Sequence, residues 1–164
     1  MNIFLKSLIF LVVFSLLHFG YEITGWTFFT PFCGINESVF QHLKMAFWGY
    51  LLLTLFVEYP FLRNKIKNNK NGITKIKNFW YSRFLSVIVL PWIIFIIWYL
   101  LPAVYGRAKS LMVDLVWAIA VNYLSCVVVG NIEKATEEVE FKTSTKISIL
   151  FLLLLLGFLF VWFT

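Results

Sequence analysis

Hydrophobic residues fill five segments of the chain, and each segment is long enough to cross a bilayer as a helix. A spanning helix needs about 20 mostly apolar residues, and more polar segments separate these five. The sequence therefore predicts an all-α integral membrane bundle that forms a single transmembrane domain over residues 1–164. The expected spans are residues 3–19, 39–61, 84–101, 111–130 and 147–163, with a basic loop at residues 62–83.

The first apolar segment also resembles a secretory signal peptide, because Lys6 precedes an apolar run. No small-x-small cleavage site follows that run. Residues 20–25 read Gly-Tyr-Glu-Ile-Thr-Gly, which is typical of a helix end. We therefore expect this segment to be retained as the first span.

The composition agrees with a membrane protein. The chain is 61% hydrophobic and 13% charged, whereas soluble domains are about 45–50% apolar and about 25% charged. Its mean hydropathy is +0.86, and its 19.3 kDa leave no room for a separate soluble catalytic domain. We expect the protein in the cell membrane, with the lipid bilayer as its main partner.

The basic residues indicate an orientation. The net charge is +6, but the lysines and arginines lie between apolar runs, so we do not expect a nucleic-acid partner. Eleven of the 14 basic residues fall on one side of the alternating spans, and Lys44, Arg107 and Lys109 fall on the other. Because short basic loops stay cytoplasmic, the pattern predicts a cytoplasmic N-terminus and an extracytoplasmic C-terminus. Lys134, Glu138 and Lys142 are four apart, which predicts a solvated helical extension of the fourth span.

Polar residues gather near the expected extracytoplasmic surface. Charged groups within a bilayer are costly, so each is a candidate functional residue. His18 and Glu22 are four apart at the end of the first span and share a helix face, and Asp114 lies about one turn into the fourth span. The candidate binding residues are His18, Glu22, Asn36, Glu37, His42, Lys44 and Asp114.

Three interpretations of this polar layer remain open. Imidazole nitrogens and carboxylate oxygens are ligands for zinc or another divalent metal, which makes His18, Glu22, Glu37 and His42 candidate ligands. The same groups can instead form a hydrogen-bonded cluster that holds the first two spans together, or bind a proton or solute without a metal.

Two further pairs are expected in this layer. Ser38 followed by Gln41 predicts a capping box at the start of the second span. Lys44 and Asp114 lie at similar depths in the second and fourth spans, which predicts an ion pair between them.

Two blocks of this sequence resemble a group of small bacterial integral membrane proteins that share a domain of unknown function. The blocks are H-x-x-Y-E-x-x-G at residues 18–25 and N-E-S-V-F-Q-H-L-K at residues 36–44. The second block reads N-E-S-x-W-E-H-L-K in the group, so Phe40 and Gln41 replace a tryptophan and a glutamate. The group also carries a short polar tail with another histidine, whereas this chain stops at Thr164. The resemblance implies a five- or six-helix bundle and no established activity. If the tail of the group helps to build the site, the site here is incomplete.

Three classes of function follow. The polar layer can bind or transport a small solute or ion, with the Lys44–Asp114 pair as a gate, and the sequence favours this class. It can form a metal-dependent membrane hydrolase for a lipid or its headgroup, with His18 and His42 as ligands and Glu37 as general base. It can also hold together an accessory subunit whose partner is a second copy or another membrane protein.

Overall fold

A computed structural model describes residues 1–66, 72–106 and 110–164, and within these ranges the chain is all-helical, with no strand. Five helices are long and apolar enough to cross a membrane, which confirms the predicted fold class. Lys67, Lys70, Arg107 and Lys109, which entered the charge argument, lie outside the described residues. The elements are α1 (Ile3–Thr24), η1 (Thr27–Phe29), α2 (Val39–Leu53), η2 (Thr54–Glu58), α3 (Tyr59–Ile66), α4 (Gly72–Tyr105), α5 (Leu111–Glu137) and α6 (Thr143–Trp162).

Short polar residues start three of the long helices. The side chains of Asn2, Ser38 and Ser110 each accept a hydrogen bond from a backbone N–H in the first turn of α1, α2 and α5. Gly25 ends α1 in the left-handed conformation, with φ of 65°, which glycine adopts without steric cost. These local signals mark the starts of three spans and the end of one.

The helices extend further than the hydrophobic pattern predicted. The expected loop at residues 62–83 is helical up to Ile66 and again from Gly72, because polar residues continue a helix beyond the apolar stretch. The predicted solvated extension of the fourth span is confirmed in part. α5 continues beyond residue 130 and Lys134 on it is exposed, but the helix ends at Glu137, before Lys142. Glu133 is buried because it faces three other spans.

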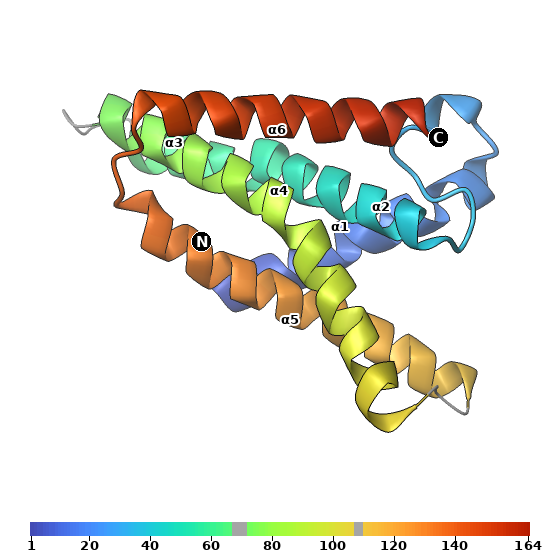
Figure 1. Cartoon of the computed structure of the whole chain (residues 1–164). Helices are drawn as coiled ribbons and strands as arrows, with labels where there is room; N and C mark the ends of the chain where they lie inside the picture. The colour runs from blue at the N-terminus through green and yellow to red at the C-terminus, as the bar shows by residue number, and fades with distance from the viewer. Residues whose placement is uncertain (67–71, 107–109) are drawn as a thin grey trace.

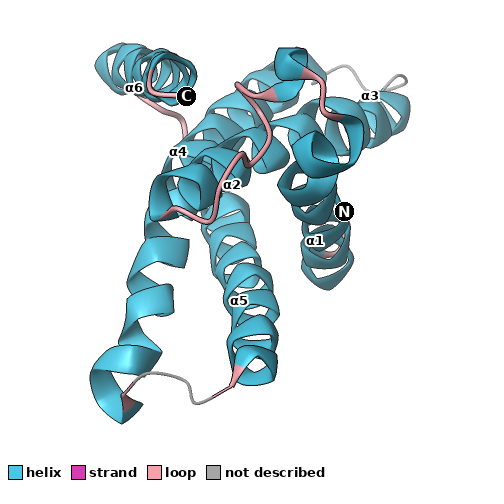
Figure 2. Ribbon diagram, turned by 90° about the vertical axis from the view of Figure 1, so that its right-hand side faces the viewer, coloured by secondary structure: helices cyan, strands magenta, loops and turns pink. Residues whose placement is uncertain are grey.

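Figure 1 shows α2 and α6 running side by side, while the α4–α5 hairpin diverges from them toward its tip. Figure 2 shows the same separation from the end where α2 begins and the chain ends. At the other end of the bundle, α1, α2, α4 and α5 pack closely around a core that includes Phe10, Tyr50, Leu90 and Val129. The bundle is therefore tight at one end and open at the other.

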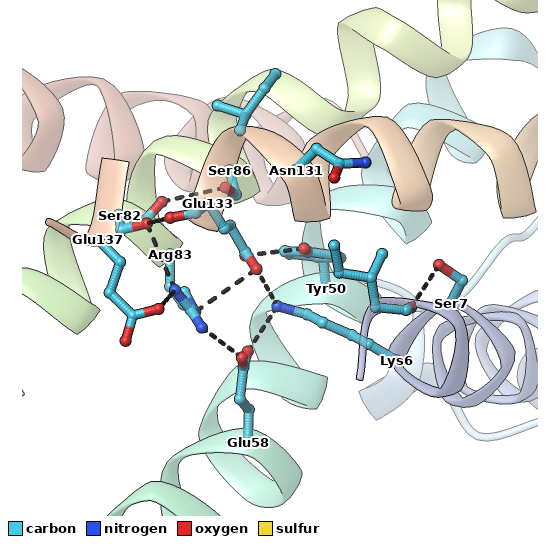
Figure 3. A network of polar contacts seen from close by, with 12 residues as sticks. Lys6, Ser7, Tyr50, Glu58, Ser82, Arg83, Ser86, Asn131, Glu133 and Glu137 are labelled. Atoms are coloured by element: carbon cyan, nitrogen blue, oxygen red, sulfur yellow. Dashed lines mark hydrogen bonds and ion pairs between the residues drawn. The ribbon is translucent and has the colours of Figure 1, made fainter. Parts of the chain in front are cut away.

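A network of buried charged side chains lies at the tight end (Figure 3). The Lys6 ammonium lies 2.6 Å from a carboxylate oxygen of Glu58 and 2.5 Å from one of Glu133. The Arg83 guanidinium lies 2.6 Å from the other oxygen of Glu58, and Tyr50 donates a hydrogen bond to Glu133 at 2.8 Å. Two buried cations thus face two buried carboxylates, each from a different span.

The Tyr50 ring and a serine hydroxyl add to this network, which we call the inner ion network because it lies inside the bundle (Lys6, Tyr50, Glu58, Arg83 and Glu133). The Lys6 ammonium lies 4.6 Å from the centre of the Tyr50 ring, a distance that favours a cation–π interaction. The backbone carbonyl of Glu133 accepts a hydrogen bond from the Ser82 hydroxyl at 3.0 Å. The charges are therefore both neutralised and hydrogen-bonded, as buried charges must be.

A π-helical turn brings Glu58 into the inner ion network. The segment η2 inserts between α2 and α3 without interrupting the span, and both Thr54 and Glu58 within it are buried. A π turn adds a residue to the helical repeat and so rotates the residues that follow it. This local change in the helix places the Glu58 carboxylate between Lys6 and Arg83.

We predict that Lys6→Met destabilises the protein far more than Lys134→Met, although both remove one positive charge. Lys6 is 2% exposed and its loss leaves two buried carboxylates with only Arg83, whereas Lys134 is exposed. Breaking a buried pair costs about 3–5 kcal/mol, which thermal unfolding in detergent can measure as a lower Tm. Equal small shifts for both variants would contradict a stabilising role for the network.

Candidate functional site

Three of the predicted site residues meet near the C-terminal end of α1 and the start of α2. His18 comes from α1, His42 from α2, and Glu37 from the residues just before α2. One ligand atom from each lies within 4.8 Å of the other two. The Glu37 carboxylate presents one oxygen to His18 Nε2 at 3.6 Å and the other to His42 Nε2 at 3.5 Å. We call this group the His–Glu–His cluster.

One hydrogen bond fixes the orientation of the His42 ring. Its Nδ1 lies 2.9 Å from the backbone carbonyl oxygen of Ser38, which can only accept a hydrogen bond. Nδ1 therefore donates this bond, and Nε2 faces Glu37. Metal-binding histidines are commonly oriented by such a bond from the second ring nitrogen.

Two distances within the cluster are close to those of a tetrahedral metal site. Two ligand atoms that each lie about 2.1 Å from a tetrahedral zinc ion are about 3.4 Å apart. The two histidine-to-carboxylate distances are 3.5 and 3.6 Å. They involve different oxygens of Glu37, and one ligand atom from each residue lies within 4.8 Å of the other two, so a bound ion would draw the three side chains closer together.

The His–Glu–His cluster is partly exposed to solvent. The side chains of His18 and His42 are 22% and 33% exposed, whereas that of Glu37 is 81% exposed. Among the described residues, His18 Nδ1 is buried and has no hydrogen-bond partner. The cluster therefore has a protected histidine side and an open carboxylate side, where a fourth ligand can approach.

A cavity of about 460 Å³ adjoins the cluster, within the size range of about 300–1,000 Å³ that is usual for ligand sites. All three cluster residues line it, together with side chains from α1, α2, α4 and α5. Its remaining walls are mostly aromatic and aliphatic. They include Phe14, Ile94, Trp98, Leu115 and Ile119. The polar Asn122 is the lining residue of α5 that is furthest from Ser110 along the helix.

The other candidates near the cluster have different positions. Glu22 is exposed and does not belong to the group of ligand atoms that the described residues bring together. The Asn36 side chain accepts a hydrogen bond from the Ser38 N–H at 3.0 Å, so it shapes the start of α2. Ser38 caps the Gln41 N–H at 3.4 Å as predicted, but the Gln41 side chain does not complete the box, since its Oε1 has no partner within the described part of the chain.

The predicted Lys44–Asp114 ion pair is wrong. Lys44 is fully buried, and its ammonium donates to the Thr30 carbonyl at 2.6 Å and to the Thr164 hydroxyl at 3.3 Å. Asp114 is exposed on α5, on the hairpin that diverges from α2. Similar depth in the membrane does not bring two residues together when their helices separate.

Cys33 lies in the loop beside Lys44. Burial raises the pKa of the Cys33 thiol, although the positive charge of Lys44 opposes this shift. The thiol therefore stays protonated at neutral pH, whereas a metal ligand must be a thiolate.

Two groups of residues were missed by the sequence analysis. The inner ion network was interpreted only as topology signals and a solvated face, because periodicity does not show which polar residues turn inward. The cavity lining was missed because aromatic residues in a span, such as Trp98, look like ordinary lipid-facing or core positions. Glu58, a charged residue within the expected second span, was the available signal for the first group.

Comparison with known proteins identifies a family but no activity. The chain belongs to the family of unknown function DUF6512, whose family model matches residues 2–164. This agrees with the resemblance to a family of unknown function. No curated protein and no solved structure matches the chain.

We predict that Lys44 and Asp114 contribute to stability independently. Asp114→Asn should change the free energy of unfolding by less than about 0.5 kcal/mol, because Asp114 is exposed. Lys44→Ala should cost roughly 2 kcal/mol or more, because it leaves a gap in the core and two unpaired acceptors. In the double variant, the change in the free energy of unfolding should equal the sum of the two single changes. A deviation from that sum above about 0.5 kcal/mol would show that Lys44 and Asp114 interact after all.

Proposed function

We propose that this member of the family is a metal-dependent membrane hydrolase that acts on a lipid at the outer surface of the membrane. The observation that carries the proposal is the His–Glu–His cluster at the mouth of an apolar cavity. Zinc is the first candidate, because two histidines and one carboxylate are a common ligand set of catalytic zinc sites. Such sites keep a fourth position open for water or substrate.

The site can support hydrolysis in the following way. His18, Glu37 and His42 would hold the ion, which would supply Lewis-acid chemistry for a substrate carbonyl group and a water molecule. The water oxygen forms a bond to the carbonyl carbon, and the bond from that carbon to the headgroup oxygen or nitrogen breaks. One proton of the water passes to the leaving atom. Glu37 offers two carboxylate oxygens to the cluster, so one can hold the ion while the other accepts this proton.

Transport of a small solute or ion is the second candidate, and one observation favours it. Within the described residues, Asn122 Oδ1 and Ser125 Oγ are buried without hydrogen-bond partners. They lie on α5 between the cavity and Glu133, so they mark a discontinuous polar track toward the inner ion network. The paired charges of that network close the inner end of the bundle, which favours hydrolysis over passage across the membrane.

The metal content of the detergent-purified protein tests the first step of the proposal. We predict about one zinc ion per chain, as expected for a site with three protein ligands. His18→Ala, His42→Ala and Glu37→Gln should each lose the ion, because each removes one of the three ligands. Elemental analysis after removal of free metal gives the measurement.

Glu22→Gln is the matched control for Glu37→Gln. It removes an exposed carboxylate near the cluster but no ligand, so the protein should keep its zinc. A folded wild-type protein without bound metal, even after incubation with zinc, would refute the site. Loss of zinc in Glu22→Gln as well would show that the ligand set differs from the one proposed.

Reconstitution separates hydrolysis from transport. We predict that the zinc-loaded protein in phosphatidylcholine and phosphatidylethanolamine vesicles releases fatty acid from these lipids, and that Glu37→Gln does not. Mass spectrometry of the lipid extract measures the products. Zinc uptake into the vesicle lumen without lipid cleavage would instead favour the transport candidate.

A further inference from the structure

The cavity beside the His–Glu–His cluster extends further into the membrane than a headgroup requires. On α1 its lining runs from Phe19 to Leu11, which corresponds to about 12 Å at 1.5 Å per residue. The hydrocarbon core of a bilayer is about 30 Å thick, so one leaflet contributes about half of that. The cavity therefore has nearly the depth of the chain region of one leaflet.

The side of the cavity formed by α4 and α5 faces the lipid. Phe95 and Tyr99 on α4 and Leu115 and Ile119 on α5 line the cavity, and all four are also exposed on the surface of the bundle. These helices belong to the hairpin that diverges from α2 and α6 in both views (Figures 1 and 2). A hydrocarbon chain can therefore enter sideways from the bilayer without crossing water.

Four residues of α5 form the wall along which such a chain would lie. Leu115, Ala118, Ile119 and Asn122 share one helix face by their spacing, and all line the cavity. Ala118 is the smallest of them and provides space in the middle of the wall.

Asn122 marks the end of this wall furthest from the cluster. It is 7% exposed, and among the described residues its Oδ1 has no hydrogen-bond partner. An unpaired polar atom is an unfavourable contact for a methylene group, so it limits how far a chain extends.

We propose that the cavity holds one unbranched acyl chain of an outer-leaflet lipid, with the carbonyl group at the His–Glu–His cluster and the chain end near Ala118 and Asn122. The inference rests on the proposed function, which places the reacting carbonyl at the metal ion. It adds that the substrate is an acyl lipid and that this face of α5 determines the chain length.

The test uses a dodecanoyl hydroxamate that carries a diazirine at the end of its chain. The hydroxamate chelates zinc, and light couples the diazirine to the nearest residues. The full-length protein is loaded with zinc in lipid nanodiscs and illuminated with the probe, and the labelled peptides are mapped by mass spectrometry. We expect labels around Ile94 and around Ala118–Asn122, and a probe with a butanoyl chain should label residues nearer the cluster.

Ala118→Phe should fill the wall and abolish labelling at these deep positions while zinc binding is retained. Ala120→Phe is the matched control, since Ala120 lies on the same helix but does not line the cavity, and it should leave the labelling unchanged. If Ala118→Phe does not fold, Ala118→Leu provides a smaller obstruction that should shift the labels toward the cluster.

The possible failures are distinguishable. Bound zinc with labels scattered over the lipid-facing surfaces, or unaffected by Ala118→Phe, would overturn the acyl-chain inference but leave the metal site intact. Absence of zinc would overturn the proposed function. Deep labelling that persists without zinc would refute the placement of the carbonyl at the metal ion.

Discussion

The buried ion pairs between Lys6, Glu58, Arg83 and Glu133 are the interaction on which the arrangement of the bundle depends. They join four spans at one level of the membrane, where unpaired charges would be too costly. Because these charges must stay within ion-pair distance, α1, α2, α4 and α5 cannot separate at this end. The helices can diverge only beyond the level of the network, which is where the cavity lies.

The divergence places two different chemical environments next to each other. The His–Glu–His cluster lies beside the loop before α2 and is partly exposed, whereas the cavity below it is lined mainly by apolar side chains. This order matches the bilayer itself, in which polar headgroups lie above hydrocarbon chains. A lipid can therefore place its polar and apolar parts in matching surroundings without leaving its leaflet.

The sequence predicted much of the fold and less of the site. The all-helical fold, the five spans and the Ser38 cap were predicted from local sequence patterns, and the structure shows each of them. His18, Glu37 and His42 were found because polar residues at span ends are conspicuous, although Glu22 was included without spatial support. The Lys44–Asp114 pair failed because depth along a helix gives no information on which helix faces meet. The π turn that positions Glu58 has no signal in the hydrophobic pattern.

The difference in contact length and burial between the two groups of charged residues favours a functional role for the His–Glu–His cluster over a purely structural one. In the inner ion network, buried cations face buried carboxylates at 2.5 and 2.6 Å, and Tyr50 donates a further hydrogen bond. In the His–Glu–His cluster, the Glu37 side chain is 81% exposed and its oxygens lie 3.5 and 3.6 Å from the histidine nitrogens. Contacts this long and this exposed contribute little to holding two helices together. They leave the ligand atoms accessible to an ion, which is what the proposed function requires.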